Sequence, residues 1–319
     1  MPVKEQIYQL TLPTPYAVGD VHVYVVKGEA LTLIDAGVNT DEAWEHFETK
    51  LKQIGYRPED IEQIILTHHH PDHTGLVNRF DYADGIYAHH LVDQWLRRDP
   101  EFMNHYVAFF TELYHSFGVP KEFISLERRA KTTLRLSGRG KLTDTLKEGD
   151  SLPGHPNWKV LETPGHAQSH LSFFNEHTGE LLGGDHILYH ISSNPLLEPP
   201  IKPGGERPKP MLQYRESMQR FNHYTVGKVF PGHGKVFEGV ENLINQRIKK
   251  QEERAEKVYQ MIQQQPLSPF EICKRLFPKQ YDTQFDLTLS ETVGQLDFLE
   301  AQGKVKQVTE DEHILYAVS

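Results

Sequence analysis

Residues 68–73 contain a His-x-His-x-Asp-His pattern, whose four named side chains can all chelate a metal ion. His68, His70, Asp72 and His73 place three imidazoles and one carboxylate in this short segment. A loop that only turns the chain does not need so many chelating groups. Imidazole and carboxylate ligands suit zinc, and also iron or manganese, because none of these ions requires a thiolate. A single tetrahedral ion cannot use all four groups and keep a position open for water, so we expect two ions.

Three further candidate ligands stand far along the chain, each beside a glycine. They are His166 in Pro-Gly-His, Asp185 in Gly-Gly-Asp and His233 in Pro-Gly-His-Gly. Glycine allows the backbone to approach a metal ion closely. We therefore expect two Zn²⁺ ions, with Fe or Mn as alternatives. The first would bind His68, His70 and His166, the second Asp72, His73 and His233, and Asp185 would bridge them. We expect His69 to point away into the structure and His170 to be a pocket-wall or surface residue.

The hydrophobic pattern predicts the elements that position these residues. We expect strands over residues 6–12, 21–27, 31–35, 61–67, 159–163, 171–175 and 180–183. Helices are expected over residues 41–54 and 74–80. The strand over 61–67 leads directly into the histidine cluster, which therefore lies in the loop at the end of a strand. Chemically capable residues also follow the later strands, where loops on a rigid sheet often carry function.

Two other regions have a helical pattern. Residues 91–126 are rich in aromatic side chains, from Trp95 to Phe117, and predict a helical insertion of about residues 91–147 that either packs as core or lines a substrate pocket. After residue 240 we expect a helix over 242–264, a helix capped by Ser268, a helix over 289–302 and a hairpin over 304–318. This order suggests a winged-helix domain over 241–319, behind a catalytic domain over 1–240.

Composition limits the class of protein and its partners. A net charge of −10, from 34 basic and 44 acidic residues, makes nucleic acid an unfavoured partner without excluding a local basic face. No run of about 18 apolar residues or signal-peptide pattern is found, so we expect a cytoplasmic protein that does not enter the membrane. Cys273 is the single cysteine, which excludes an intramolecular disulfide. We expect a small-molecule substrate, and a homodimer is possible.

Taken together, these motifs resemble the metallo-β-lactamase superfamily. The resemblance covers about residues 6–240 and rests on five segments: 33–37, 67–75, 164–166, 184–185 and 231–234. It implies an α+β fold, a four-layer αβ/βα sandwich with a dimetal site at one edge, and it places ligands at the seven positions named above. It also implies that Asp35 holds a ligand histidine by its second ring nitrogen. The alternative is that Asp35 caps a turn before Gly37.

The ligand set and the C-terminal tail indicate which branches of this superfamily the chain resembles. Common zinc β-lactamases use a cysteine ligand and lack such a tail, whereas the glyoxalase II, lactonase and nuclease branches use the ligand set present here. A C-terminal winged helix makes the chain similar to bacterial hydrolases related to β-lactamase-like protein 2. Diiron oxidoreductases of the superfamily need a flavin domain, which this sequence does not show.

The expected chemistry is hydrolysis by a hydroxide that bridges two cations, because such ions lower the pKa of water to about 7. We assign Asp72 the general acid/base role. The leading hypothesis is a glyoxalase II-like hydrolase of a small ester or thioester, and the alternatives are a lactonase and a nuclease or phosphodiesterase. A DNA-binding role of the winged helix is a third hypothesis. The acidic residues at 286, 291, 297 and 300, on or near its expected recognition helix, favour packing or dimer contact instead.

Overall fold

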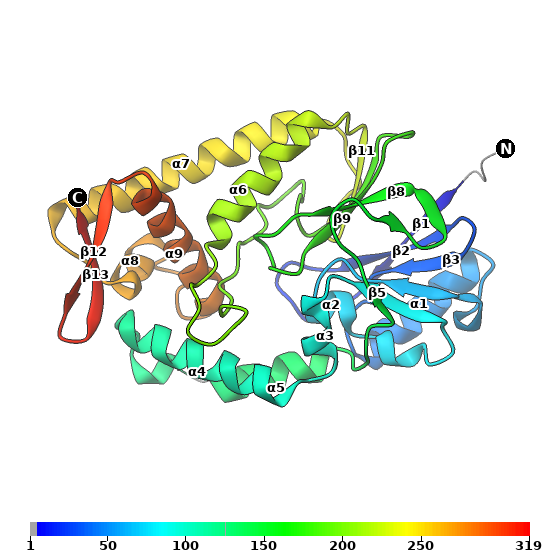
Figure 1. Cartoon of the computed structure of the whole chain (residues 1–319), viewed down its shortest axis with the longest axis horizontal. Coiled ribbons are helices and arrows are strands. Elements are labelled where there is room, and N and C mark those ends of the chain that lie inside the picture. Colours follow the sequence, from blue (N-terminus) through cyan, green and yellow to red (C-terminus); the bar gives the residue numbers. More distant parts are fainter. Residues whose placement is uncertain (1–4, 125) are drawn as a thin grey trace.

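Two β-sheets packed face to face form one end of the molecule in the computed structural model, which describes residues 5–124 and 126–319 (Figure 1). The first sheet has the order β1-β2-β3-β4-β5-β6, with β1 (Gln6–Leu12), β2 (Val21–Lys27), β3 (Leu31–Ile34), β4 (Gln63–Ile65), β5 (Gly85–Ala88) and β6 (Asp144–Thr145). The second has the order β11-β10-β9-β8-β7, with β7 (Ser151–Leu152), β8 (His155–Glu162), β9 (Leu171–Asn175), β10 (Glu180–Gly184) and β11 (Lys228–Pro231).

Strand direction determines where the loops of the site lie. Strands β3 to β6 are parallel, so the segments that follow them leave the first sheet at one edge. In the second sheet β8 and β10 both run antiparallel to β9, and β11 runs parallel to β10. Strands β8, β10 and β11 therefore point the same way, and His166, Asp185 and His233 each follow one of them.

Helices cover the outer face of each sheet. Helix α1 (Asp41–Gln53) starts at Thr40, whose side chain accepts a hydrogen bond from the Ala43 amide, and it buries Phe47 and Leu51 on the first sheet. Helices α6 (Pro210–Arg220) and α7 (Val240–Gln264) share a buried cluster with the second sheet. A third cluster, which includes Tyr24 of β2 and Phe173 of β9, lies between the sheets. The four layers agree with the sandwich expected from the sequence.

Several predicted elements agree closely with the structure. Strands β1, β2 and β9 coincide with their predicted ranges, and β4 is shorter than predicted. The helix predicted over residues 74–80 is wrong, because this segment forms only the single turn α2 (Pro71–Thr74) and a 3-10 helix, η2 (Val77–Arg79). The amide of Gly75 donates to the Gly37 carbonyl at 2.6 Å instead of continuing a helical ladder, which explains the interruption. Two more 3-10 turns are η1 (Pro58–Asp60) and η4 (Phe221–His223).

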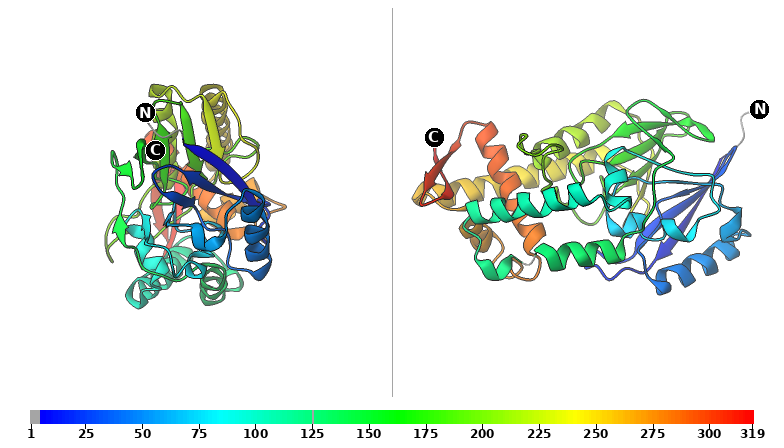
Figure 2. Two further views of the ribbon diagram at one scale, coloured as in Figure 1. Left: turned by 90° about the vertical axis from the view of Figure 1, so that its right-hand side faces the viewer. Right: turned by 60° about the horizontal axis from the view of Figure 1, so that its bottom comes forward.

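The predicted insertion packs against the C-terminal helices. It contains α3 (Leu91–Leu96), α4 (Pro100–Ser116), η3 (Lys121–Phe123) and α5 (Leu126–Leu136), and its residue 125 lies outside the described residues. Phe110 and Tyr114 of α4 share a buried cluster with Phe270 and Phe285 of the C-terminal region. Figure 2 shows α4 alongside these helices. Phe110 and Tyr114 are thus core residues that join the insertion to the C-terminal region.

The C-terminal region follows the long helix α7 and ends in a hairpin. It consists of α8 (Pro269–Leu276), α9 (Phe285–Ala301), β12 (Val305–Glu310) and β13 (His313–Val318). Ser268 caps α8 in a capping box with Glu271, as predicted. Helix α9 would be the recognition helix of a DNA-binding winged helix, but most of its residues are buried inside the protein. Among the described residues, none of the helices has the length and apolar character needed to cross a membrane.

Candidate metal centre

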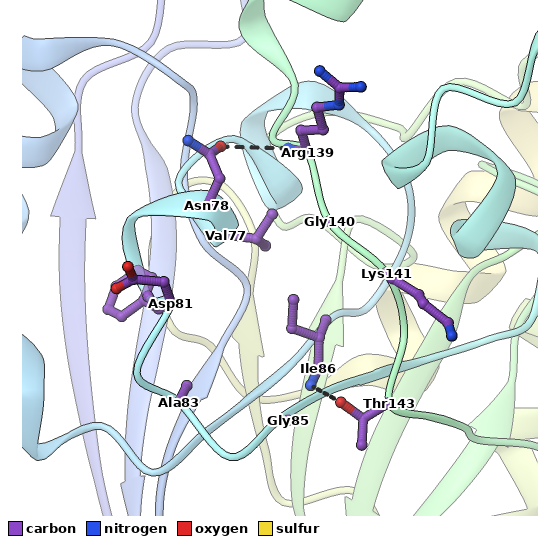
Figure 3. Close-up of a pocket in the computed structure, with 11 residues that line it drawn as sticks. Val77, Asn78, Asp81, Ala83, Gly85, Ile86, Arg139, Gly140, Lys141 and Thr143 are labelled. Carbon is purple, nitrogen blue, oxygen red and sulfur yellow. Dashed lines mark hydrogen bonds between the residues drawn. The ribbon is translucent and has the colours of Figure 1, made fainter.

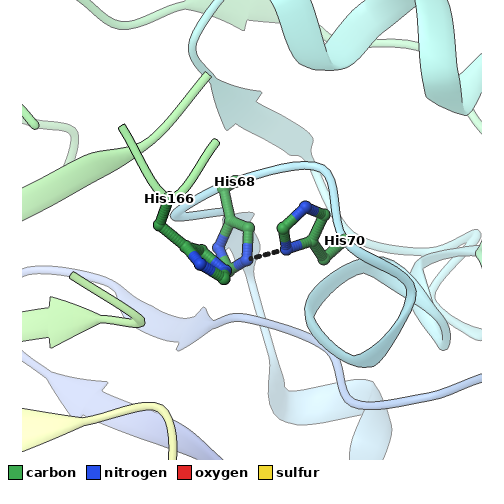
Figure 4. Close-up of side chains that lie close together, drawn as sticks. All are labelled: His68, His70 and His166. Atoms are coloured by element: carbon green, nitrogen blue, oxygen red, sulfur yellow. Dashed lines mark hydrogen bonds between the residues drawn. The ribbon is translucent and has the colours of Figure 1, made fainter. Parts of the chain in front are cut away.

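All seven predicted ligand residues converge at the edge of the two sheets. Their ligand atoms form three overlapping groups, within each of which the atoms lie within 4.8 Å of one another. The groups are His68 with His70 and His166, His68 with His73 and Asp185, and Asp72 with His73 and His233. Figure 4 shows the rings of the first group directed toward one another, with 2.9 Å between His68 Nε2 and His70 Nδ1. Segments far apart in the chain thus meet at one point.

Asp185 stands between the two outer groups. Its Oδ2 atom lies 3.4 Å from His233 Nε2 and 3.6 Å from His166 Nε2, while its Oδ1 atom lies 3.3 Å from His73 Nε2. Asp72 Oδ2 lies 3.3 Å from His233 Nε2 on the far side. One carboxylate therefore faces ligand atoms of both groups, and its role as a bridge between two ions stays a prediction.

Unpaired buried atoms test whether these residues fit a metal. His73 Nε2, His166 Nε2, His233 Nε2 and Asp185 Oδ1 are buried, and their contacts of 3.3 to 3.6 Å with one another or with neighbouring carboxylate oxygens lack the geometry of hydrogen bonds. A buried polar atom without a partner costs about 1–3 kcal/mol, and four of them converging on one place is unusual in a folded protein. Cations placed among these atoms would satisfy all four. The donor set of nitrogen and carboxylate oxygen therefore fits two divalent ions.

Asp35 orients two of the histidines. His73 Nδ1 donates to Asp35 Oδ2 at 2.7 Å, which leaves the lone pair of Nε2 directed at the site. The Thr67 hydroxyl donates to the same carboxylate at 2.8 Å, so it accepts a hydrogen bond from His68 Nδ1 at 2.9 Å. Asp35 has a φ of 59°, a left-handed conformation, and the Thr67 amide holds its Oδ1 atom at 2.7 Å. The contact with a histidine is the one expected from the sequence.

Backbone carbonyls orient the other two distant histidines. His166 Nδ1 lies 2.9 Å from the Asn194 carbonyl and 2.9 Å from the Ser193 hydroxyl. His233 Nδ1 donates to the Asp20 carbonyl at 2.8 Å. In each case the proton resides on Nδ1 and Nε2 is left as the potential ligand atom.

The electrostatics of the site divide the histidines into two classes. Burial and neighbouring imidazoles lower the pKa of His68 and His70, so both are neutral and available as ligands. Burial alone would lower the pKa of His233, but the carboxylates of Asp185 and Asp72 outweigh it and raise the pKa to about 10. The pKa of His73 is raised for the same reason, with Asp185 and Asp35 as the main carboxylates. The carboxylates thus stabilise positive charge at these two rings, and a metal ion bound at Nε2 would supply that charge in place of the proton.

The structure also reveals contributors that the sequence analysis left out. His170 is buried rather than exposed, and its Nε2 atom accepts a hydrogen bond from the Asp185 amide at 3.1 Å. The only sequence signal for it was its position four residues after His166. His69 points away from the ligand groups, as expected, and its ring stacks on Trp95 of the insertion at 4.6 Å. At Gly232 a Cβ atom would collide with Asp185 Oδ1, so a glycine is required there.

A surface pocket of about 350 Å³ lies elsewhere, between η2, β5 and residues 139–143 (Figure 3). Asn78, Asp81, Arg139 and Lys141 line its polar side, and none of the seven candidate ligands contributes to it. It is therefore separate from the metal centre.

Comparison with known proteins agrees with this geometry. The sequence model of the family described as the metallo-beta-lactamase superfamily matches residues 16–233. The chain is 40% identical to a Bacillus subtilis protein named "Probable metallo-hydrolase YqjP", over 98% of each chain. A metallo-beta-lactamase family protein from Thermus thermophilus has a similar solved structure, with a TM-score of 0.83, 25% identity and 98% of both chains covered. A beta-lactamase domain protein from Burkholderia ambifaria shares the fold, with a TM-score of 0.78, 21% identity, and coverage of 98% of this chain and 92% of that one.

Proposed function

Because this chain belongs to the metallo-beta-lactamase superfamily and is one of its metal-dependent hydrolases, we propose that it cleaves a small ester or thioester with two divalent cations. The observation that carries this proposal is the convergence of four buried, unpaired ligand atoms from His73, His166, Asp185 and His233. Zn²⁺ is the proposed native ion, since imidazole and carboxylate ligands suit zinc and a hydrolase needs no redox change.

The proposed ligand set divides the seven residues between two ions. His68, His70 and His166 would hold one ion, Asp72, His73 and His233 the other, and Asp185 would contact both. When bound, such ions polarise a substrate carbonyl and acidify a water molecule to a pKa of about 7.

Asp72 has the second proposed role, as general acid and base. Its carboxylate lies at the site, with Oδ2 3.3 Å from His233 Nε2 and the side chain mostly buried. A carboxylate there receives the proton of the attacking water and delivers it to the leaving group. Four of the histidines contribute position and charge instead, because a partner already holds the second ring nitrogen of His68, His73, His166 and His233.

Metal analysis followed by a substrate panel tests the proposal. Protein purified without an affinity tag should hold about two equivalents of divalent metal, and His166→Ala should lose part of it. His177 is an exposed histidine in the turn between β9 and β10, so His177→Ala is the matched control and should keep both equivalents. Thioester, ester, lactone, phosphodiester and RNA substrates are then compared on the loaded enzyme. If only RNA or the phosphodiester is cleaved, the protein is a nuclease or phosphodiesterase and the proposal of an ester or thioester hydrolase is wrong.

For the C-terminal region we propose a winged-helix-like unit that packs rather than binds DNA. The acidic side chains of its central helix are already paired inside the protein. Arg207 contacts Asp297 at 2.6 Å, and Arg254 contacts Glu291 at 2.5 Å. Retention of duplex DNA that weakens with salt would contradict this role.

A further inference from the structure

A segment of six residues, 193–198, lies between the loop that carries His166 and helix α9; we call it the strap. On its inner side the Asn194 carbonyl and the Ser193 hydroxyl each lie 2.9 Å from His166 Nδ1. The carboxylate of Glu198 accepts a hydrogen bond from the Gln168 amide at 2.7 Å. The strap thus holds both the ring of His166 and the backbone that follows it.

On its outer side the strap is bound to α9. The Asn194 side-chain amide donates to the Leu287 carbonyl at 2.9 Å, and the Leu197 amide donates to the Ser290 hydroxyl at 3.2 Å. The Leu197 side chain is buried in the cluster that contains Leu289. Asn194 therefore contacts the metal loop through its backbone and α9 through its side chain.

The contacts on α9 fall on a single face of that helix. Residues 287, 290, 294 and 297 are spaced by three, four and three positions, which places them in one stripe. At Gly294 a Cβ atom would meet Met211 Cβ of α6 at 2.8 Å, so the helices approach closely there. Asp297 pairs with Arg207, further along the same connecting segment. One face of α9 thus supports the chain from the strap to the start of α6.

We propose that helix α9 positions the metal ligand His166 through the strap, which makes Asn194 and Ser290 positioning residues of the metal centre. The inference rests on the proposed function, because it assigns a role to the C-terminal region in the same site. A ligand ring is directed by the partner of its second nitrogen, and loss of such a partner typically weakens metal binding by about 10–100-fold. Here the partner is a carbonyl whose own position depends on a helix far along the chain.

Two substitutions test the connection without removing the carbonyl that contacts His166. Asn194→Ala and Ser290→Ala each remove one bond between the strap and α9. We expect each substitution to lower the affinity for one of the two Zn²⁺ ions by about 10-fold or more and to leave the affinity for the other ion unchanged. Competition with a chromophoric chelator measures both affinities. Replacement of Zn²⁺ by Co²⁺ should show an altered visible spectrum for the ion bound more weakly, because the spectrum reports ligand geometry.

Ser268→Ala is the matched control, since Ser268 caps α8 in the same C-terminal region and has no contact with the strap among the described residues. It should lower the melting temperature and leave both Zn²⁺ affinities unchanged. Unchanged affinities in both strap variants would overturn the inference, as would an equal loss of affinity in Ser268→Ala. A wild-type protein that binds no Zn²⁺ would overturn the proposed function as well, so the two failures are distinguishable.

Discussion

Asp35 Oδ2 accepts a hydrogen bond from His73 Nδ1 at 2.7 Å, and both side chains are buried. The carboxylate sits at the end of β3, while the histidine follows β4 in the next position of the sheet. This pair determines which nitrogen of His73 faces the metal centre. We therefore expect metal affinity to depend on Asp35, which is not itself a candidate ligand.

Asp35→Asn should weaken binding of Zn²⁺ by about 10–100-fold while the protein stays folded. Asparagine tolerates the left-handed conformation at this position, so the substitution adds little backbone strain. The asparagine keeps one acceptor oxygen for the Thr67 amide but lacks the second, which now accepts hydrogen bonds from the Thr67 hydroxyl and from His73 Nδ1. Chelator competition measures the affinity and circular dichroism checks the fold. An unchanged affinity would show that the tautomer of His73 is set by something else.

Asp72→Asn should reduce kcat by about 10²–10⁴-fold, because an amide cannot accept the proton of the attacking water. The panel substrate with the highest turnover serves for the measurement, with metal content determined on the same sample. Loss of metal and activity together would indicate a ligand role alone. Full activity with full metal content would exclude Asp72 as the general base.

Removal of metal should lower the melting temperature markedly. An ion whose free concentration is about 100 times its dissociation constant stabilises the folded state by about 2.7 kcal/mol. In addition, the buried Nε2 atoms of His73, His166 and His233 would lose their metal partners when the ions leave. Calorimetry with EDTA and then with restored Zn²⁺ measures the difference. Equal melting temperatures in the two samples would argue against a metal site at these residues.

Glu198→Gln should stabilise the protein at pH 8 and much less at pH 5. Burial raises the pKa of Glu198 to about 7, although the hydrogen bond from the Gln168 amide opposes the shift. A carboxyl group with a raised folded-state pKa is neutral in both states at low pH. Its ionisation then destabilises the fold increasingly as pH rises from about 4.5 to 7, and the penalty is constant above that.

The glutamine keeps the acceptor for the Gln168 amide and removes the charge, so we expect a gain of about 1–3 kcal/mol at pH 8. Denaturant unfolding of metal-free protein at both pH values measures it, which keeps metal loss out of the comparison. A gain of equal size at the two pH values would mean that ionisation of Glu198 is not the cause.

Arg207→Met should destabilise the protein by about 3–5 kcal/mol, because it leaves the fully buried carboxylate of Asp297 without its cation. The double variant Arg207→Met with Asp297→Leu should recover much of that loss, since replacing both partners leaves no buried charge. Denaturant unfolding of the three proteins gives the two differences. A double variant as unstable as the single one would indicate that packing, not charge pairing, determines the cost.

Local patterns were sufficient for much of the fold and of the candidate site. The hydrophobic pattern predicted strands β1, β2 and β9, and the segment that begins with Ser268 predicted the start of α8. The seven ligand candidates were recognisable because imidazole and carboxylate groups beside glycine at strand ends are rare without a chemical purpose. Residues 74–80 have a hydrophobic pattern that predicted a helix. The structure has no continuous helix there, because the Gly75 amide donates its hydrogen bond to the Gly37 carbonyl.

Only the tertiary structure decided what supports those ligands. The Asn194 carbonyl that holds His166 and the Asp20 carbonyl that holds His233 are backbone groups that every residue has, and the Ser290 hydroxyl that contacts the strap belongs to a common residue type. A backbone carbonyl is the same in every residue type, so no sequence pattern can predict which carbonyl contacts a ligand histidine. The sequence alone determined which side chains could bind metal, while long-range packing determined which nitrogen each one presents, because that choice depends on contacts between segments far apart in the chain.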